Sequence, residues 1–253
     1  MGVSLQGLSQ QDETVTVEFH DGSAGRYDLV LSADGIHSQV RRLVVGANLV
    51  QPVGQVAWRF ITRCPPEVTT WTVLLGREVT FLAVPIGRGQ VYCSCDAPTD
   101  STPRPESDDV TGRLAELLTG FAAPVPAILD TLGPDGAVHV GPIEEVTLDR
   151  WSRGSVLLVG DAANAMSPNM AEGAAMALED GLVLAECLAS GRGIAQTVAT
   201  FQARRRPRTQ WVLAQTHRRD RTRSLPPALR NLVLRRWGQN IFHANYRPLL
   251  ELP

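Results

Sequence analysis

The most constraining feature of the sequence is the stretch from Val156 to Asp180, VLLVGDAANAMSPNMAEGAAMALED. Its first four residues are all apolar, which is typical of a parallel strand that is covered on both faces. Gly160 and Asp161 end this run with a small residue and a carboxylate, Pro168 lies in a loop, and strong helix formers follow from Ala171. A loop at the carboxyl end of a strand, followed by a helix N-terminus, is where α/β sheets bind anionic or electron-rich groups. The stretch therefore predicts a strand, a tight acidic turn and a helix.

Eight positions of this stretch are typical of one family of flavoproteins. They are Gly160, Asp161, Ala162, Ala163, Pro168, Gly173, Glu179 and Asp180. In this order and spacing they resemble the second flavin-contacting motif of FAD-dependent aromatic monooxygenases, the para-hydroxybenzoate hydroxylase-like group. The chain differs from that motif at Asn164, where the family has His, at Ala171 and Glu172, where it has Gly-Gln, and at Ala175, where Asn is common. A match of this length favours common ancestry with flavoproteins over chance.

The resemblance implies a role for each part of the motif. Asp161 would accept a hydrogen bond from a ribityl hydroxyl of FAD. The backbone N–H groups of Ala174 and Ala175 would face the pyrimidine end of the flavin ring. The other cofactor-binding positions that it implies are Gly160, Pro168 and Gly173. The simpler alternative is a strand, turn and helix in which Asp161 only caps the turn.

Alternating apolar and polar residues near the N-terminus predict a β-hairpin. Val15, Val17 and Phe19 alternate with polar residues, and the turn-forming residues 20–23 follow them. The return strand of this hairpin is predicted from Tyr27 to Ala33.

The return strand ends at Asp34-Gly35, and Ser38 is the predicted N-cap of a short helix from Gln39 to Leu43. As a dipeptide, Asp-Gly indicates only a turn. In the context DLVLSADGIHSQVR it resembles the Asp-Gly motif of the same family. The resemblance implies that Asp34 and Gly35 lie at the flavin edge and contribute to binding both FAD and the pyridine nucleotide.

The region from Gly54 to about Val146 has a different pattern. Apolar runs at residues 55–61, 70–75, 79–84 and 90–95 are separated by turn residues, and one amphipathic helix is predicted from Asp109 to Leu118. Cys93 and Cys95 share a face of the last run, and without further His or Cys nearby they predict core thiols and not a metal site. The region is predicted to be an inserted antiparallel sheet, and its position in the chain matches that of the family's substrate domain.

Trp58-Arg59 lies near the start of this predicted sheet. The pair resembles a Trp-Arg pair of some relatives, in which the Arg helps to position an anionic aromatic substrate. The alternative is that Arg59 lies on a solvated edge of the sheet, and the sequence does not decide between the two.

The C-terminal part of the chain is rich in arginine and is predicted to be helical from about Arg204. A basic tail that contains Trp211 and Trp237 is one pattern of nucleic-acid-binding proteins. However, Pro207 and the pair at 226–227 are expected to interrupt it, and its apolar residues provide faces for packing. The tail also resembles the family's C-terminal helices, so nucleic acid is not expected as a partner.

The composition is that of an ordinary globular chain. It has 253 residues, of which 43% are hydrophobic, and a net charge of −2. No apolar run approaches the length of a membrane span, and the N-terminus lacks the pattern of a signal peptide. Four cysteines are too few for a disulfide scaffold. A cytoplasmic location is expected.

The family begins with a strand–GxGxxG–helix unit that binds the FAD pyrophosphate, and this sequence contains no such unit. We expect the chain to correspond to about the last two thirds of a family member. It would be truncated, or completed by a missing N-terminal segment or a partner chain, and free of FAD or poorly soluble alone. The DNA just upstream is expected to encode the missing unit.

The predicted fold class is α/β, the C-terminal two thirds of a Rossmann-like FAD-binding domain with an inserted antiparallel substrate sheet. Residues 1–50 and 147–190 are assigned to the FAD-binding domain, 51–146 to the substrate domain, and 191–253 to C-terminal helices that pack on the FAD domain. The predicted activity is hydroxylation of a small aromatic substrate with FAD, NADH or NADPH, and O2, without a protein nucleophile or metal. The alternative is a flavin-free, non-catalytic remnant that acts as a binding or interaction protein.

Overall fold

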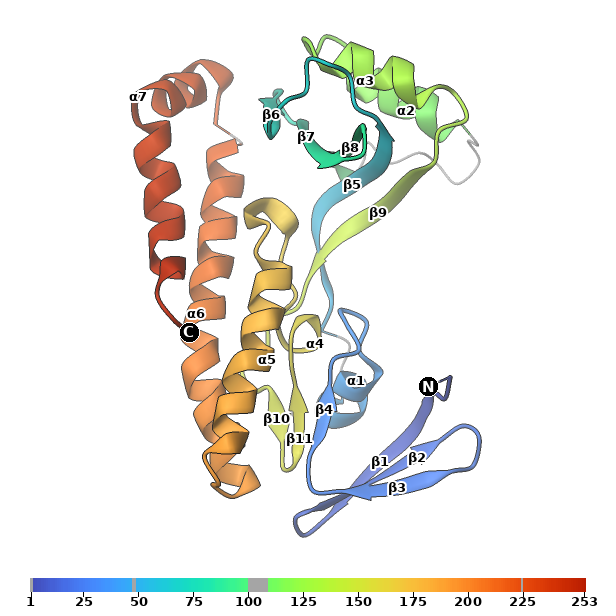
Figure 1. Ribbon diagram of the computed structural model, residues 1–253, viewed down its shortest axis with the longest axis vertical. Helices are drawn as coiled ribbons and strands as arrows, with labels where there is room; N and C mark the ends of the chain where they lie inside the picture. The colour runs from blue at the N-terminus through green and yellow to red at the C-terminus, as the bar shows by residue number, and fades with distance from the viewer. Residues whose placement is uncertain (1, 47–48, 100–108, 224) are drawn as a thin grey trace. The chain divides into compact units, whose positions relative to one another are not determined.

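The computed structural model describes residues 2–46, 49–99, 109–223 and 225–253. The chain divides into two compact units. The first unit comprises residues 1–51, 144–220 and 239–253, and the second comprises residues 52–143 and 221–238. Figure 1 shows how the helices and strands follow one another from β1 to η3.

A mixed sheet in the first unit contains the strands that precede the two acidic turns. Its strand order is β10 (Ser152–Arg153), β11 (Val156–Leu158) and β4 (Val30–Ser32). β11 runs parallel to β4, with Leu157 opposite Leu31, and antiparallel to β10. The apolar run predicted as a buried strand is confirmed, because all three residues of β11 are fully buried.

The other sheet of the first unit is antiparallel. Its strand order is β1 (Leu5–Gln11), β2 (Thr14–Phe19) and β3 (Ala24–Tyr27). The predicted turn between β2 and β3 is confirmed, since the Phe19 N–H donates to the Ser23 carbonyl at 2.9 Å.

The predicted single return strand from Tyr27 to Ala33 is wrong. The chain leaves the antiparallel sheet after Tyr27 and enters the mixed sheet at Val30. The two halves pair with β2 and with β11, which lie more than a hundred residues apart in the sequence. Strand pairing of this kind depends on tertiary contacts and not on local propensity.

Helices complete the first unit, and two of them continue into the second. They are α1 (Gln39–Val45), α4 (Asp161–Asn164), η2 (Pro168–Met170), α5 (Gly173–Ala189), α6 (Ile194–Arg223), α7 (Pro227–Tyr246) and η3 (Arg247–Leu250). The expected interruption at Pro207 is wrong, because α6 is continuous through it. A proline inside a helix removes one hydrogen bond, and packing along the rest of the helix can offset that loss.

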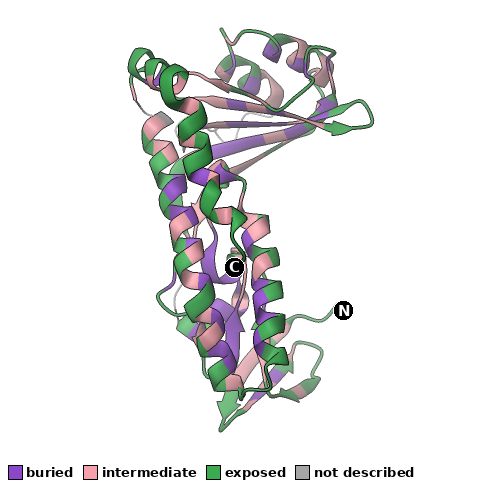
Figure 2. Ribbon diagram, turned by 60° about the vertical axis from the view of Figure 1, so that its left-hand side comes forward, coloured by how far each residue is buried: buried purple, intermediate pink, exposed green. Residues whose placement is uncertain are grey.

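The core of the first unit lies between its strands and one side of α5 and of α6. Buried residues, purple in Figure 2, recur on α6 at Val198, Phe201, Arg205, Thr209 and Val212, which is the helical period. Burying a large apolar side chain contributes about 1.5–3 kcal/mol. On β4, in contrast, Leu31 is 46% exposed. The residues of β11, in contrast to Leu31, are fully covered.

The second unit is built on a five-stranded sheet. Its strand order is β6 (Thr72–Leu75), β7 (Thr80–Gly87), β8 (Gln90–Pro98), β5 (Gln51–Arg63) and β9 (Val138–Glu145). β6 pairs with β7, β7 with β8, and β8 with β5, all antiparallel. The four apolar runs predicted as strands are confirmed, while β9 was not predicted.

Two helices cover one face of this sheet. The predicted helix is confirmed as α2 (Val110–Leu117), and the Asp109 carboxylate caps it by accepting from the Gly112 N–H at 2.7 Å. The expectation of a single helix is wrong, because α3 (Val125–Leu132) follows. Pro124 is its N-cap residue and a further proline lies in its first turn, where proline is tolerated.

Cys93 and Cys95 are fully buried in the core of the second unit, as expected for core thiols. Burial raises the pKa of the Cys93 thiol to about 12, so the thiol is protonated and unreactive at neutral pH. Among the described residues, no helix is both long enough and apolar enough to cross a membrane.

Candidate functional site

The two acidic turns lie at the carboxyl ends of adjacent parallel strands. β4 leads to Asp34 and β11 leads to Asp161, and the Val159 N–H donates to the Ser32 carbonyl at 2.9 Å. Arg41 from α1 is fully buried and donates to the Ala162 carbonyl at 3.0 Å. The structure therefore brings together two motifs that are more than a hundred residues apart, at the sheet end where α/β folds bind ligands.

The Asp34 carboxylate is occupied by groups of its own chain. One oxygen accepts from the Ser32 hydroxyl, and the other accepts from the backbone N–H groups of Gln39 and Val40, at 2.8 and 3.1 Å. Burial would raise the pKa of Asp34, but the donors from Ser32, Ser38 and Val40 outweigh it, so the pKa lies below its usual value. Asp34 is thus an ionised cap for α1, and any cofactor contact is additional to that role.

Gly35 and Ser38 shape the rest of this turn. Gly35 has a φ of +79°, which favours glycine, and its carbonyl accepts from the Ser38 N–H at 3.0 Å. The predicted cap is confirmed, because the Ser38 hydroxyl accepts from the Arg41 N–H at 2.9 Å.

Asp161 contrasts with Asp34. It is the first residue of α4, it is exposed, and it has no hydrogen-bond or ion-pair partner in the described part of the chain. Desolvation by the surrounding protein raises the pKa of its carboxyl. A carboxylate in this state gains stability from any hydroxyl or N–H that a ligand brings, and that is the role implied for it by sequence.

The N-terminus of α5 provides the complementary donors. The helix begins at Gly173, so the N–H groups of Gly173, Ala174 and Ala175 have no partner within the helix. Its N-cap residue, Glu172, makes no capping hydrogen bond with its side chain. These N–H groups, with the helix dipole, favour an electron-rich ligand at this end of α5.

The loop between the two helices holds two further features. Pro168 is exposed at the start of η2, and Ala171 has a φ of +57°, a value at which the family's Gly would be unstrained. Asn164, which stands where the family has His, is buried, and its amide nitrogen has no hydrogen-bond partner in the described part of the chain. One unpaired acceptor and several unpaired donors therefore surround the α4–α5 loop, and they fit the polar groups of a flavin.

A buried ion-pair network supports the turn before Asp161, and the sequence did not indicate it. Arg205 is fully buried, and its guanidinium binds the Asp180 carboxylate at 2.6 Å and Glu179 at 2.5 Å. The other oxygen of Asp180 accepts from the Gly160 N–H at 2.8 Å. Gly160 has a φ of +55°, and a Cβ atom there would lie 3.2 Å from that of Ala177. Gly160 is thus needed both for its backbone conformation and for close packing on α5.

A second set of contacts, also not predicted, holds the loop itself. One Glu145 oxygen accepts from the Ser167 N–H at 3.1 Å, and the other lies 2.8 Å from the His217 ring nitrogen. Asn169 contacts the Asp220 carboxylate on the same face of α6. These contacts could not be predicted from the sequence, because the partners of the loop lie on β9 and α6, which are distant from it in the sequence.

Trp58 and Arg59 belong to the second unit. Trp58 is fully buried in its core, whereas Arg59 is half-buried on the opposite face of β5, across from Ser94 of β8. The alternative that Arg59 lies on a sheet edge is wrong, because β5 lies between β8 and β9. Arg59 belongs to the second unit, whereas the motif residues belong to the first.

The charged form of Glu172 is disfavoured by its surroundings. Burial, followed by repulsion from Glu179, raises the pKa of its carboxyl, and Arg208 only partly offsets this. A carboxyl whose pKa is higher in the folded than in the unfolded state lowers the free energy of unfolding as pH rises from the unfolded-state pKa to the folded-state pKa. Above the folded-state pKa this loss of stability stays constant. Glu172→Gln is therefore expected to increase the free energy of unfolding at neutral pH, with the gain disappearing below about pH 4. Urea denaturation across this pH range measures it.

The control for that prediction is Glu13→Gln, which changes an exposed carboxyl of the same unit. It should change stability little at any pH. A gain for Glu172→Gln that is independent of pH would contradict the explanation.

Comparison with known proteins identifies relatives that match most of the chain. The chain is 28% identical over 222 residues to the FAD-dependent urate hydroxylase of Klebsiella pneumoniae, covering 86% of this chain and 58% of that protein. It is 28% identical over 226 residues to the aurachin C monooxygenase/isomerase of Stigmatella aurantiaca, covering 86% and 57%. The structure of Klebsiella pneumoniae HpxO complexed with FAD and uric acid superimposes with a TM-score of 0.83 at 24% identity, covering 98% of this chain and 64% of that one.

These likenesses confirm the predicted α/β fold. The chain spans somewhat more than half the length of these curated relatives. A single family description, FAD binding domain, matches residues 1–216. That match includes both acidic turns, the α5 N-terminus and the sheet of the second unit. The chain therefore belongs to the FAD binding domain family, as its two motifs predicted.

Proposed function

We propose that this chain forms the greater part of an FAD-dependent monooxygenase that hydroxylates a small aromatic compound with NAD(P)H and O2. The observation that carries the proposal is the unpaired Asp161 carboxylate beside the uncapped N-terminus of α5, in a member of the FAD binding domain family. When bound, FAD would supply the redox chemistry, with one oxygen atom of O2 entering the ring and the other leaving as water.

The residues of the chain would bind and orient the cofactor. Asp161 would accept a hydrogen bond from a ribityl hydroxyl, and Gly160 and Pro168 would shape the turn and loop beside it. The N–H groups of Gly173, Ala174 and Ala175 would face the ring where reduction builds negative charge, which the helix dipole stabilises. Asp34 and Gly35, which follow the adjacent strand, would lie at the flavin edge.

The substrate is proposed to be a small, electron-rich aromatic compound. The names of the relatives support this, since they include a urate hydroxylase and a 6-hydroxynicotinate 3-monooxygenase. Arg59 is the proposed contact for an anionic group, because it is half-buried on the sheet face that α2 and α3 do not cover. In this scheme residues 51–146 form the substrate domain, and residues 191–253 support the cofactor domain.

We also propose that a strand–GxGxxG–helix unit, from the same polypeptide or a partner chain, completes the cofactor domain. Two surfaces of the first unit support this. β4 has no strand on its second edge among the described residues, and its Leu31 is 46% exposed. On α5, Leu178 and Leu182 are 73% and 64% exposed. Such apolar surface is usually covered in a folded protein.

Asp161→Ala tests the central assignment. A charge-assisted hydrogen bond contributes about 1.5–3 kcal/mol, so the dissociation constant of FAD should rise roughly ten- to a hundredfold. Quenching of flavin fluorescence measures it, with FAD titrated into the chain alone and into the chain mixed with a strand–GxGxxG–helix polypeptide. Asp161→Asn, which keeps an acceptor without the charge, should have an intermediate effect.

The matched control is Asp28→Ala, which removes an exposed carboxylate between β3 and β4, outside both motifs. It should leave the dissociation constant unchanged. Equal affinities for wild type and Asp161→Ala would overturn the role of Asp161. Absence of FAD binding under both conditions would favour the flavin-free alternative.

A further inference from the structure

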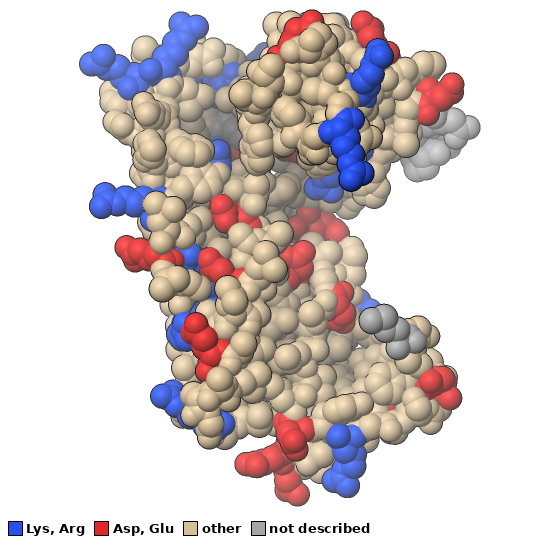
Figure 3. Space-filling model, in the orientation of Figure 1, with Lys and Arg blue, Asp and Glu red and all other residues tan. Residues whose placement is uncertain are grey.

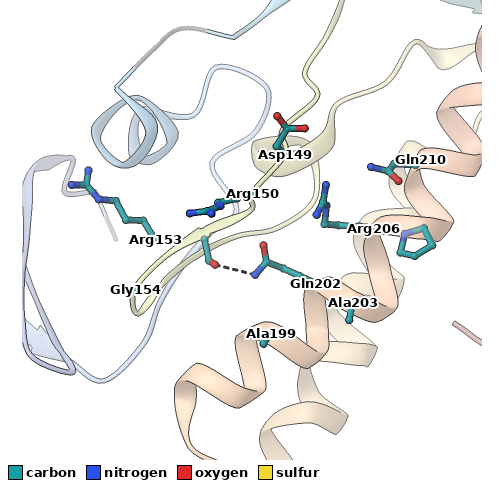
Figure 4. Close-up of a pocket in the computed structure, with 11 residues that line it drawn as sticks. Asp149, Arg150, Arg153, Gly154, Ala199, Gln202, Ala203, Arg206 and Gln210 are labelled. Carbon is teal, nitrogen blue, oxygen red and sulfur yellow. Dashed lines mark hydrogen bonds between the residues drawn. The ribbon is translucent and has the colours of Figure 1, made fainter.

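The first unit contains a hollow whose lining includes none of the proposed cofactor-binding residues. It has a volume of about 760 Å³ and lies between α6 and the hairpin that precedes β11 (Figure 4). Its lining residues are Asp149, Arg150, Ser152, Arg153, Gly154, Ala199, Gln202, Ala203, Arg206, Pro207 and Gln210. Because β11 leads away from this hairpin towards Asp161, the hollow lies at the opposite end of the strand from the acidic turns.

One side of the hollow is a face of α6 with small side chains. Ala199, Ala203 and Pro207 line it at intervals of four residues, which leaves space above the helix. Pro207 has no N–H, so the Ala203 carbonyl lacks its usual partner within the helix. This carbonyl is therefore a candidate hydrogen-bond acceptor for a ligand.

Arg206 differs from the other arginines around it. Arg204 pairs with Glu186, Arg205 with Asp180, and Arg208 with Glu179. The Arg206 guanidinium has no hydrogen-bond or ion-pair partner among the described residues, and its Nε atom is buried as well as unpaired. A buried, unpaired donor on a charged group is costly, so an anionic partner would be strongly favoured.

The opposite side of the hollow is formed by the hairpin, which is hydrogen-bonded to α6 and carries a second cation, Arg150. Gln202 accepts from the Trp151 N–H at 2.9 Å and donates to the Ser152 hydroxyl at 3.0 Å, which fixes the hairpin against α6. Arg153 donates to the Val44 carbonyl at 3.1 Å and points away from the hollow in Figure 4. Arg150 has no hydrogen-bond or ion-pair partner in the described part of the chain and is one of the residues that line the hollow.

We propose that this hollow binds a phosphorylated sugar, either free or as the ribose phosphate of a nucleotide. The Arg150 and Arg206 guanidinium groups would bind the phosphate, since planar guanidinium groups suit phosphate oxygens. The Asp149 carboxylate, which a purely inorganic anion would avoid, and the Ala203 carbonyl would accept from sugar hydroxyls. The combination of two cations with two acceptors distinguishes a sugar phosphate from inorganic phosphate.

Isothermal titration calorimetry of the wild-type chain with ribose 5-phosphate, AMP, inorganic phosphate and ribose tests the proposal. Ribose 5-phosphate should bind roughly tenfold or more tightly than either inorganic phosphate or ribose. AMP binding as tightly would identify a nucleotide as the source, and AMP binding much more weakly would identify a free sugar phosphate. Equal affinities for ribose 5-phosphate and inorganic phosphate would overturn the proposal.

Three variants separate the two halves of the ligand. Arg206→Gln should weaken both ribose 5-phosphate and inorganic phosphate roughly tenfold or more. Asp149→Asn should weaken ribose 5-phosphate but not inorganic phosphate, because it removes only the acceptor for hydroxyls. Arg150→Gln, on an exposed turn where folding is not at risk, should repeat the effect of Arg206→Gln.

The matched control is Arg26→Gln, which removes an exposed arginine of β3 outside the hollow. It should leave all affinities unchanged. Equal losses for Arg26→Gln and Arg206→Gln would show only a general effect of net charge and would overturn the site. None of these measurements depends on FAD, so the result is separate from that for the proposed oxidoreductase activity.

Discussion

Replacing Arg205 by methionine is expected to lower the free energy of unfolding of the first unit by about 3–5 kcal/mol. Arg205 is fully buried and is bound to both Asp180 and Glu179. Without it, the Asp180 carboxylate, which is 3% exposed, would be left without its ion-pair partner. A buried charge without its partner is much more destabilising than the loss of an exposed pair.

The neighbouring Arg204 provides a matched control. Arg204→Met breaks the pair with Glu186, whose side chain is 64% exposed, so its loss should be within about 1 kcal/mol. Urea denaturation followed by circular dichroism measures both variants. Similar losses for the two would show that Arg205 acts only through helix propensity and not through the buried network.

The effect of Arg205→Met should also depend on pH through Glu179. Burial raises the pKa of this carboxyl, but hydrogen bonds from Arg208 and Arg205 outweigh it, so the pKa lies below its usual value. A depressed carboxyl pKa contributes stability above the unfolded-state pKa, and this contribution is lost as pH falls through the folded-state value. Because the variant lacks one of these donors, the gap between wild type and variant should narrow as pH falls below about 4.5.

The Arg205 network matters for function because it ends at the Gly160 N–H, next to Asp161. If Asp161 contributes to FAD binding, Arg205→Met should therefore also lower the affinity for FAD. Arg205 itself lies on α6 and is not one of the proposed cofactor contacts. Arg205→Lys keeps the charge but lacks the planar fork that spans two carboxylates. It should recover only part of the stability, and full recovery would show that charge alone is sufficient.

Replacing Trp58 by alanine should lower the free energy of unfolding of the second unit by about 3–5 kcal/mol, because it leaves a large cavity in the core. Trp58 is fully buried against Phe60 and the strands on either side. Its Nε1 atom has no hydrogen-bond partner in the described part of the chain, so apolar packing is its main contribution. Trp58→Phe, which keeps an aromatic ring, should therefore have a much smaller effect.

The adjacent Arg59 serves as the comparison within the same dipeptide. It lies on the opposite face of β5 and is only half-buried, so Arg59→Gln should change stability by about 0.5 kcal/mol or less. Thermal and urea denaturation of the three variants measure these differences. A large loss for Arg59→Gln would indicate a structural role and would weaken its assignment as a substrate contact.

Three arginines of α6 are accounted for by ion pairs with α5. Arg204, Arg205 and Arg208 each bind a carboxylate of α5. On the face shown in Figure 3, basic and acidic side chains are interspersed and do not form one continuous basic surface.

Several features could be predicted from the sequence because their determinants are local. The apolar run at β11, the Gly160-Asp161 turn and the Ser38 cap each depend on residues within about one helical turn of one another. The two family motifs were readable for the same reason, since each is continuous in the chain. They were sufficient to predict the family and the α/β fold.

Other features were decided only by the tertiary structure. β3 and β4 are separate strands because their partners, β2 and β11, come from distant parts of the chain, and no local pattern specifies such pairing. α6 continues through Pro207 because packing along the helix outweighs the unfavourable propensity of proline. The same holds at the candidate site, where Asp34 and Asp161 belong to similar acidic turns. Folding supplies Asp34 with three donors and leaves Asp161 with none among the described residues, and this difference in partners makes Asp161 the candidate ligand contact.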